Sequence, residues 1–183
     1  MGSVKPDFLF LLPAIKMKYK LLLFLLIGFS AIILLVNSCK KDNSGSIQTL
    51  FTGGNWQLAS CQVAHFVGDT LKTTDTLYTT CSLNQVFTFN SNLTCTYTNY
   101  SCSPQPTATG HWSLSSNQLY LASDMTVKDT TSVTGSSMPF SQAQIVNLGL
   151  YSLVLQTGDL ELYYPSNKKR TITRYGFVRQ KNP

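Results

Sequence analysis

The sequence predicts an all-β fold, an antiparallel up-and-down barrel of eight strands. After Leu50, apolar and polar residues alternate with the period of two that is typical of half-buried strands. Short runs of Asn, Ser and Gly, which favour tight turns, separate these segments, and no helical pattern interrupts them. Short turns join antiparallel neighbours, and a long meander tends to close because closure removes its exposed edges.

The first 38 residues precede this domain and have the pattern of an export signal. A basic stretch at 16–20 stands before the apolar run 21–36, in which Ser30 is the one polar residue. A secretory signal has this order, and the run is shorter than the roughly 20 residues that span a bilayer comfortably. Met17 is an alternative start of the chain, because the basic stretch surrounds it.

Cys39 follows the apolar run, in the context Leu-Val-Asn-Ser-Cys at 35–39. A small residue precedes the cysteine, and the aliphatic Val36 lies three positions before it. This ending resembles the bacterial lipobox. The resemblance implies that the Cys39 sulfur takes a diacylglycerol, that residues 1–38 are removed, and that the new amine receives a further acyl chain. Two or three chains anchor a protein firmly, since each buried methylene contributes about 0.8 kcal/mol.

We therefore expect a lipid-anchored protein of the cell envelope, at the outer membrane. Residues 39–49 would form the lipidated cysteine and a flexible polar tether, and residues 50–183 the folded domain. An uncleaved membrane anchor is the alternative. From residue 39 onward ten Lys and Arg face seven Asp and Glu, a net charge of +3 against +6 for the whole chain. A solvated strand edge explains the basic tail at 168–181 better than nucleic-acid binding, so we expect no nucleic-acid partner.

The alternation and the intervening turns predict eight or nine strands, from nine candidate segments of the domain. They are 56–61, 87–89, 93–98, 108–114, 119–121, 145–148, 151–155, 160–164 and 172–179. Strands in this number, joined by short turns, suit a barrel, and an immunoglobulin-like sandwich is the alternative. Two connections, 63–80 and 123–141, are longer, and loops of that length are commonly functional or mobile.

Four cysteines follow the lipidation site: Cys61, Cys81, Cys95 and Cys102. An even number in an exported chain predicts disulfides, and four cysteines allow three pairings. We favour Cys95–Cys102 with Cys61–Cys81, each contributing roughly 2–4 kcal/mol by restricting the unfolded chain. Free buried thiols are the alternative. The sequence has no Cys-x-x-Cys, and its two histidines, His65 and His111, lack ligand spacing, so we expect no metal and no other cofactor.

Several short motifs resemble those of the lipocalin-like domains found on bacterial lipoproteins. Residues 54–56 (Gly-Asn-Trp) resemble the G-x-W that opens such barrels, and 87–89 (Phe-Thr-Phe) resemble their F-x-F strand. Residues 110–112 and 119–121 resemble a later G-x-W and L-x-L pair, and 174–180 resemble the closing strand. The resemblance implies a barrel over most of the chain after Leu50.

The same resemblance implies an arginine, Arg174 or Arg179, over Trp56, and a small apolar ligand in the barrel mouth. The ligand would contact inward-facing side chains: Phe87, Phe89, Tyr97, Trp112, Leu121, Leu150 and Tyr164. The alternative is a filled barrel without ligand, a protein-interaction or structural accessory lipoprotein that contacts a cell-envelope protein. A cavity of about 300 Å³ or more favours the ligand, and a packed interior favours the alternative.

No catalytic motif is recognisable in the domain. The sequence contains no G-x-S-x-G, no H-E-x-x-H and no phosphate loop. His65 near Asp69 is the one acid–imidazole neighbourhood, in a segment expected to be a loop, and chance proximity explains it better than a catalytic dyad. We therefore expect that the protein is not an enzyme.

Overall fold

The computed structural model describes Tyr19 and residues 44–129 and 132–180, and the chain divides into two compact units, 1–42 and 43–183. Tyr19 apart, the predicted signal segment lies outside the described residues, as do Cys39 and the start of the predicted tether. In the described part of the chain, no helix is long and apolar enough to cross a bilayer. The barrel belongs to the second unit.

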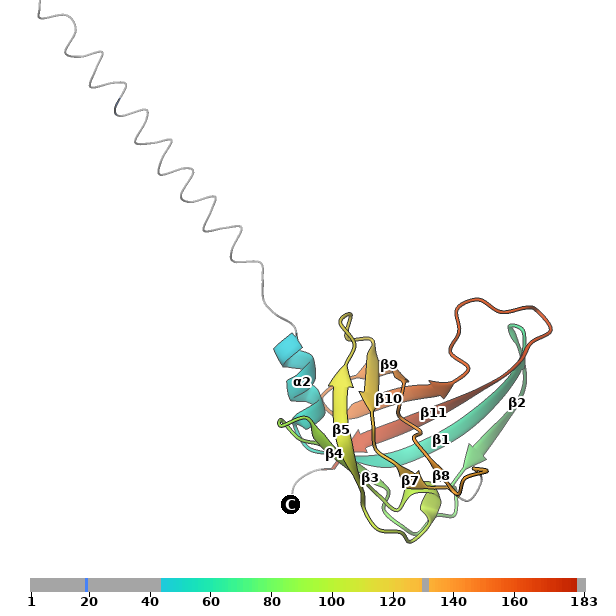
Figure 1. The fold of residues 1–183 in the computed structure, drawn as a ribbon, viewed down its shortest axis with the longest axis horizontal. Coiled ribbons are helices and arrows are strands. Elements are labelled where there is room, and N and C mark those ends of the chain that lie inside the picture. The colour runs from blue at the N-terminus through green and yellow to red at the C-terminus, as the bar shows by residue number, and fades with distance from the viewer. Residues whose placement is uncertain (1–18, 20–43, 130–131, 181–183) are drawn as a thin grey trace, which may run out of the picture. The chain divides into compact units, whose positions relative to one another are not determined.

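Eight antiparallel strands of the described chain form a closed barrel (Figure 1). They are β1 (Asn55–Val67), β3 (Val86–Phe89), β4 (Thr94–Thr98), β5 (Ala108–Leu114), β6 (Tyr120–Ser123), β9 (Ala143–Leu148), β10 (Ser152–Gly158) and β11 (Lys169–Arg179). Each strand pairs with the next in this order, and β11 returns to β1, with Trp56 opposite Arg179 and Val67 opposite Lys169. The predicted up-and-down barrel is therefore confirmed, rather than the sandwich.

The alternation of the sequence becomes an alternation of burial along the strands. Phe87 and Phe89 of β3 are buried, and their neighbours Val86 and Thr88 are only half-buried. β4 and β10 repeat this pattern. Because successive side chains of a strand point to opposite faces, every second residue contributes to one continuous core inside the ring.

The strand β2 (Thr70–Leu77) lies outside the ring and pairs with the last part of β1, Cys61–Val67. The prediction of a loop at 63–80 is therefore wrong. β2 is exposed along almost its whole length, so no apolar alternation marks it, although its threonines favour a strand. Gly68 turns the chain with a φ of +56°, and a Cβ there would collide with the Ser166 carbonyl.

Two other segments differ from the expectation. The predicted loop 123–141 contains a small hairpin of β7 (Val127–Lys128) and β8 (Ser136–Ser137). The predicted strand 160–164 is wrong, since the chain from 159 to 168 connects β10 to β11 without strand structure. Its Leu162 and Tyr163 side chains are exposed, and a few alternating residues beside a proline do not suffice for a strand.

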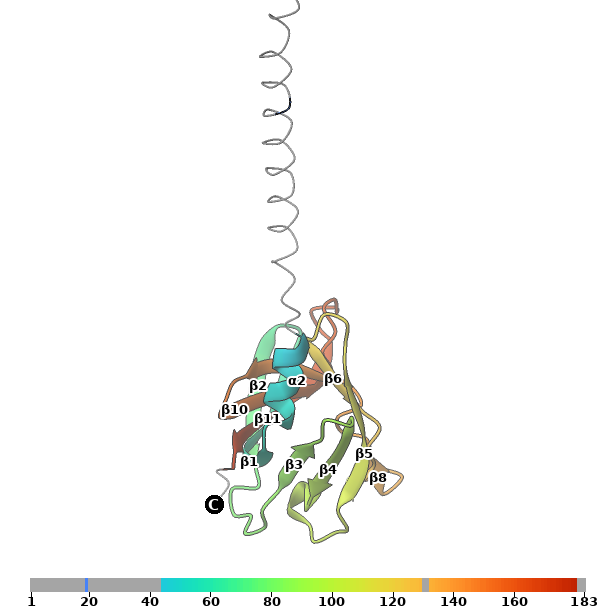
Figure 2. The same ribbon diagram turned by 90° about the vertical axis from the view of Figure 1, so that its left-hand side faces the viewer.

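Helix α2 (Ser44–Thr52) covers one end of the barrel (Figure 2). It includes residues 44–49, which the sequence predicts as tether. Phe51 of this helix is buried against Phe89 and Trp112, with ring centroids 4.9 and 5.5 Å apart. We call this end, where β1 begins, the helix end. The opposite end, which carries the longer connections and the 3-10 turn η1 (Tyr100–Cys102), is the loop end.

Candidate functional site

Five of the seven predicted ligand contacts lie together in the barrel interior: Phe87, Phe89, Tyr97, Trp112 and Leu121. None of them is more than 3% exposed. Between ring centroids, Phe87 lies 4.1 Å from Phe89 and 5.3 Å from Tyr97, and Phe89 lies 5.4 Å from Trp112. Aromatic rings at these separations are in packing contact. The four aromatic side chains are therefore in contact where the sequence predicts an apolar ligand, and Leu121 belongs to the same core cluster.

The loop end of this interior is covered by Phe140, which comes from the connection between β6 and β9. Its ring centroid lies 4.8 Å from Phe87, 5.7 Å from Tyr97 and 5.1 Å from Tyr175. Met125 and Val127 of the same connection are also buried. The sequence does not predict this contact, because one phenylalanine in a Ser-rich stretch has no period to place it.

The two remaining predicted ligand contacts lie outside the interior. Leu150 is 62% exposed in the turn between β9 and β10. Tyr164 lies in the 159–168 connection, where the Arg170 guanidinium stacks 3.6 Å from its ring centroid and its hydroxyl donates to Asp69. Tyr164 therefore fixes a surface connection to the β1–β2 turn, and the prediction that these two residues face a ligand in the barrel is wrong.

The cysteines pair differently from the prediction. The structure joins Cys81 to Cys102, whereas Cys61 and Cys95 are free and buried. Cys95 points inward from β4, where its sulfur lies 3.2 Å from the Ser123 hydroxyl, so it cannot reach Cys102 on the outer connection. The favoured pairings are therefore wrong, and the alternative of buried thiols holds for Cys61 and Cys95.

Burial also makes the two free thiols unreactive. It raises the pKa of Cys61 to about 12 and that of Cys95 above its ordinary value. The thiolate is the nucleophilic and metal-binding form, so both groups stay protonated and inert near neutral pH. Within the described residues, no group of three or more His, Cys, Asp and Glu side chains is placed to hold a metal ion.

The two histidines each lie beside an acid at the surface. His65 Nε2 lies 3.3 Å from Asp75, and His111 Nδ1 lies 3.1 Å from Asp124. Asp69, the predicted neighbour of His65, instead accepts the Tyr164 hydroxyl. Hydrogen bonds from His111 lower the pKa of the Asp124 carboxyl.

A cleft of about 310 Å³ opens in the barrel wall, and we call it the fork cleft. It opens where β1 changes partner: Asn55–Gln57 pair with β3, and Cys61–Val67 pair with β2. A bulge between Leu58 and Ser60 bends β1 at this point, and the 78–85 segment crosses the gap, with Leu58 N donating to Gln85 O at 2.8 Å.

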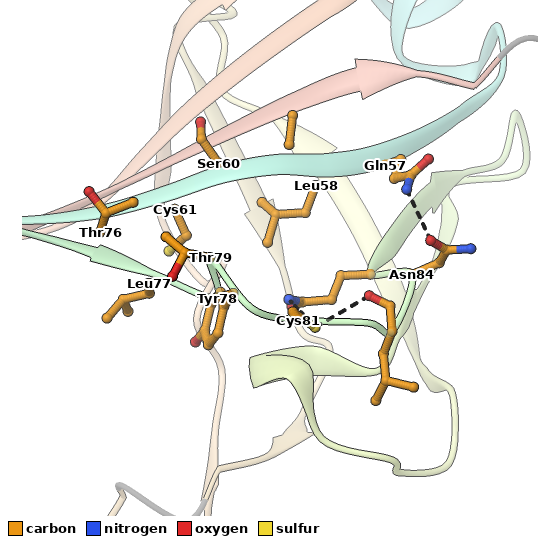
Figure 3. A pocket seen from close by; sticks show the side chains of 13 residues that line it. Gln57, Leu58, Ser60, Cys61, Thr76, Leu77, Tyr78, Thr79, Cys81 and Asn84 are labelled. Carbon is orange, nitrogen blue, oxygen red and sulfur yellow. Dashed lines mark hydrogen bonds between the residues drawn. The ribbon is translucent and has the colours of Figure 1, made fainter.

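The fork cleft is lined by uncharged side chains only. The lining residues are Gln57, Leu58, Ala59, Ser60, Cys61, Thr76, Leu77, Tyr78, Thr79, Cys81, Leu83, Asn84 and Gln85. Figure 3 shows Leu58 and Cys61 pointing from β1 toward the 78–85 segment, and the hydrogen bond from Gln57 Nε2 to Asn84 Oδ1 (3.1 Å) that closes one side. No sequence pattern predicts this site, because its residues come from two separate stretches, 57–61 and 76–85, that meet only after β1 and β2 pair.

Two residues from the motifs that resemble lipocalins, Trp56 and Arg179, meet at the helix end. Trp56 of the first G-x-W opens β1, and its Nε1 donates to Phe51 O at 2.9 Å. The Arg179 guanidinium lies 4.6 Å from the Trp56 ring, which confirms one of the two predicted arginines, whereas Arg174 is exposed. No protein-family model matches the chain, and no curated protein matches it.

Proposed function

We propose that this chain is a lipoprotein anchored to the cell envelope through Cys39, with a filled barrel that serves as a protein-interaction or structural accessory domain. The observation that carries the proposal is the continuous aromatic packing from Phe51 at the helix end to Phe140 at the loop end. The basic and apolar segments before Cys39 support the anchor, since they match an export signal that ends in a lipobox.

Because the interior is filled, a partner protein would have to contact the outer surface of the barrel. Each buried ring removes a large apolar area from water, and ring pairs add about 0.5–1.5 kcal/mol beyond that. An apolar ligand at the barrel axis would have to displace several of these rings and forfeit their contacts. The packing therefore favours the accessory domain over a carrier that encloses its ligand.

Native mass spectrometry of the full chain, purified without ligand-stripping steps, tests the filled interior. We expect the mass of the lipidated chain alone, and an organic-solvent extract that contains only membrane lipid. A stoichiometric apolar molecule that returns in independent preparations would contradict the proposal.

The anchor is tested separately with Cys39→Ser. We expect this variant to keep the precursor mass and to lose labelling by palmitate analogues, because the acylated thiol is gone. Cys95→Ser is the matched control, since Cys95 is buried in the barrel and its loss leaves the signal intact. If the unaltered chain is itself unlabelled and uncleaved, the protein is not a lipoprotein.

A further inference from the structure

The fork cleft combines hydrogen-bonding capacity with an absence of charge. Among its lining residues, Gln57, Asn84 and Gln85 carry amides and Ser60, Thr76 and Thr79 carry hydroxyls. Each amide offers donors and an acceptor side by side, and each hydroxyl offers both roles. Two larger clefts elsewhere are lined by carboxylates, those of Asp159 and Glu161 in one and of Asp124 in the other.

Gln85 gives the cleft a buried donor without a good acceptor. Its side chain is only 4% exposed, and the partner of its Nε2 group is the Cys81 sulfur at 3.9 Å. A disulfide sulfur is a weak acceptor, so this buried amide donor is poorly satisfied. A ligand oxygen at this position would supply the missing acceptor.

The cleft is also held in shape before any ligand arrives. The Cys81–Cys102 disulfide ties its floor to η1, and Cys81 N donates to Tyr78 O at 3.1 Å. The amide of Asn99 donates to Asn84 O at 3.0 Å. A preorganised site loses little conformational entropy when it binds, so a small ligand can be held by few contacts.

We propose that the fork cleft binds one unit of a neutral saccharide. Such a molecule is uncharged, carries adjacent hydroxyls that match side-chain amides, and has a C–H face that suits the half-buried Leu58, Leu77 and Tyr78. An ionic ligand would lose hydration without gaining a counter-charge from the lining, which is unfavourable. The cleft volume is at the lower end for small-molecule sites and suits one sugar unit, with the rest of a chain in solvent.

Saturation-transfer NMR on the full chain tests the site. The detergent must lack a sugar headgroup, because the maltose headgroup of a maltoside would compete with the probes. The probes are maltose, cellobiose and N,N′-diacetylchitobiose, with glucuronic acid and glucosamine as charged counterparts. We expect transfer to at least one neutral disaccharide at millimolar concentration and at least several-fold less to the charged sugars. Absence of transfer to all three neutral probes, or equal transfer to the charged ones, would overturn the proposal.

Two variants locate the binding. Thr79→Trp places a large ring at the cleft and is expected to abolish transfer, whereas Thr107→Trp, on an exposed connection outside the lining, is expected to leave it unchanged. Asn84→Ala removes one exposed amide and is expected to weaken binding about tenfold, the effect of one lost hydrogen bond, with Asn147→Ala on β9 as control. Unchanged binding by both cleft variants would overturn the proposal.

The tests of the saccharide site and of the proposed function are independent, so one proposal can be contradicted while the other holds. The cleft lies in the barrel wall, so its occupancy depends neither on the lipid at Cys39 nor on the packing at the barrel axis. An apolar molecule found by native mass spectrometry would contradict the filled interior and leave the saccharide result standing.

Discussion

At the scale of single residues, Arg179 connects three parts of the helix end. Its guanidinium lies over the Trp56 ring, donates to Leu50 O in α2, and packs close to Gly53 and Gly54, where an added Cβ would lie within 3.2 Å of its side chain. The arginine therefore holds the helix, the first strand and the last strand together. The resemblance to lipocalin-like domains implied an arginine over Trp56, but not the helix that Arg179 also contacts.

We expect Arg179→Ala to destabilise the barrel by about 1–3 kcal/mol, because the cation–π contact and the hydrogen bond to α2 are both lost. Urea unfolding followed by tryptophan fluorescence measures the change. Arg174→Ala is the control, since Arg174 is exposed on the same strand and its loss should stay within about 0.5 kcal/mol. Equal effects of the two substitutions would show that Arg179 does not connect these elements.

Tyr97 and Tyr100 differ in the hydrogen bonding of their hydroxyl groups. The Tyr97 hydroxyl is buried and has no hydrogen-bond partner among the described residues, whereas the Tyr100 hydroxyl lies 3.3 Å from that of Tyr175. Burial raises the pKa of Tyr97 well above its ordinary value and that of Tyr100 to about 12, so both hydroxyls stay protonated.

We therefore expect Tyr97→Phe to leave stability unchanged or raise it by about 1 kcal/mol, since it removes an unsatisfied group and keeps the ring. Tyr100→Phe should lower stability by a similar amount, because it leaves the Tyr175 hydroxyl without its partner. Thermal unfolding of both variants gives the comparison. A loss of stability in Tyr97→Phe would reveal a partner for that hydroxyl in the folded protein.

At the scale of elements, the sequence predicts strands that face the core and fails on those that do not. β3, β4 and β5 alternate clearly because one face of each is buried. β2 carries no such signal, since both of its faces are exposed. The fork cleft depends on β2, because it exists only where β1 passes from β3 to β2. Its residues could therefore not be predicted without the pairing of that strand.

The pairing of the cysteines is a second feature at this scale that the local sequence pattern does not predict. Cys81–Cys102 joins two connections at the loop end and closes a loop of 21 residues that contains β3 and β4. The loop-closure entropy of such a crosslink corresponds to about 3 kcal/mol. The favoured pairings instead tied the end of one strand to the loop after it, through Cys95–Cys102, and closed the connection 63–80, through Cys61–Cys81.

We expect Cys81→Ala with Cys102→Ala to lower the free energy of unfolding by about 3 kcal/mol and to make it insensitive to reducing agent. Cys61→Ala should leave that sensitivity intact, since Cys61 is a free buried thiol. Peptide mapping under non-reducing conditions identifies the bond directly. A linked Cys61–Cys81 or Cys95–Cys102 peptide would contradict the pairing.

At the scale of the whole molecule, two segments that lie outside the strands cover the two ends of the barrel. α2 supplies Phe51 at the helix end, and the connection between β6 and β9 supplies Phe140 at the loop end. The closed ring was predictable from the number of strands and their short turns. Its filled interior was not, because periodicity shows that a side chain points inward but not whether another segment meets it there.

Phe140→Ala tests whether the Phe140 ring is what keeps the barrel interior filled and without room for a ligand. Removal of the ring should cost about 3–5 kcal/mol and leave an apolar cavity beside Phe87, Tyr97 and Tyr175. Such a cavity stays dry and takes up small apolar molecules, so benzene should raise the melting temperature of the variant. Met138→Ala changes an exposed residue of the same connection and is the control. It should neither lower the stability of the protein nor make its melting temperature depend on benzene. If benzene stabilises the unaltered protein as strongly as Phe140→Ala, the interior already has room for a ligand and the accessory role is wrong.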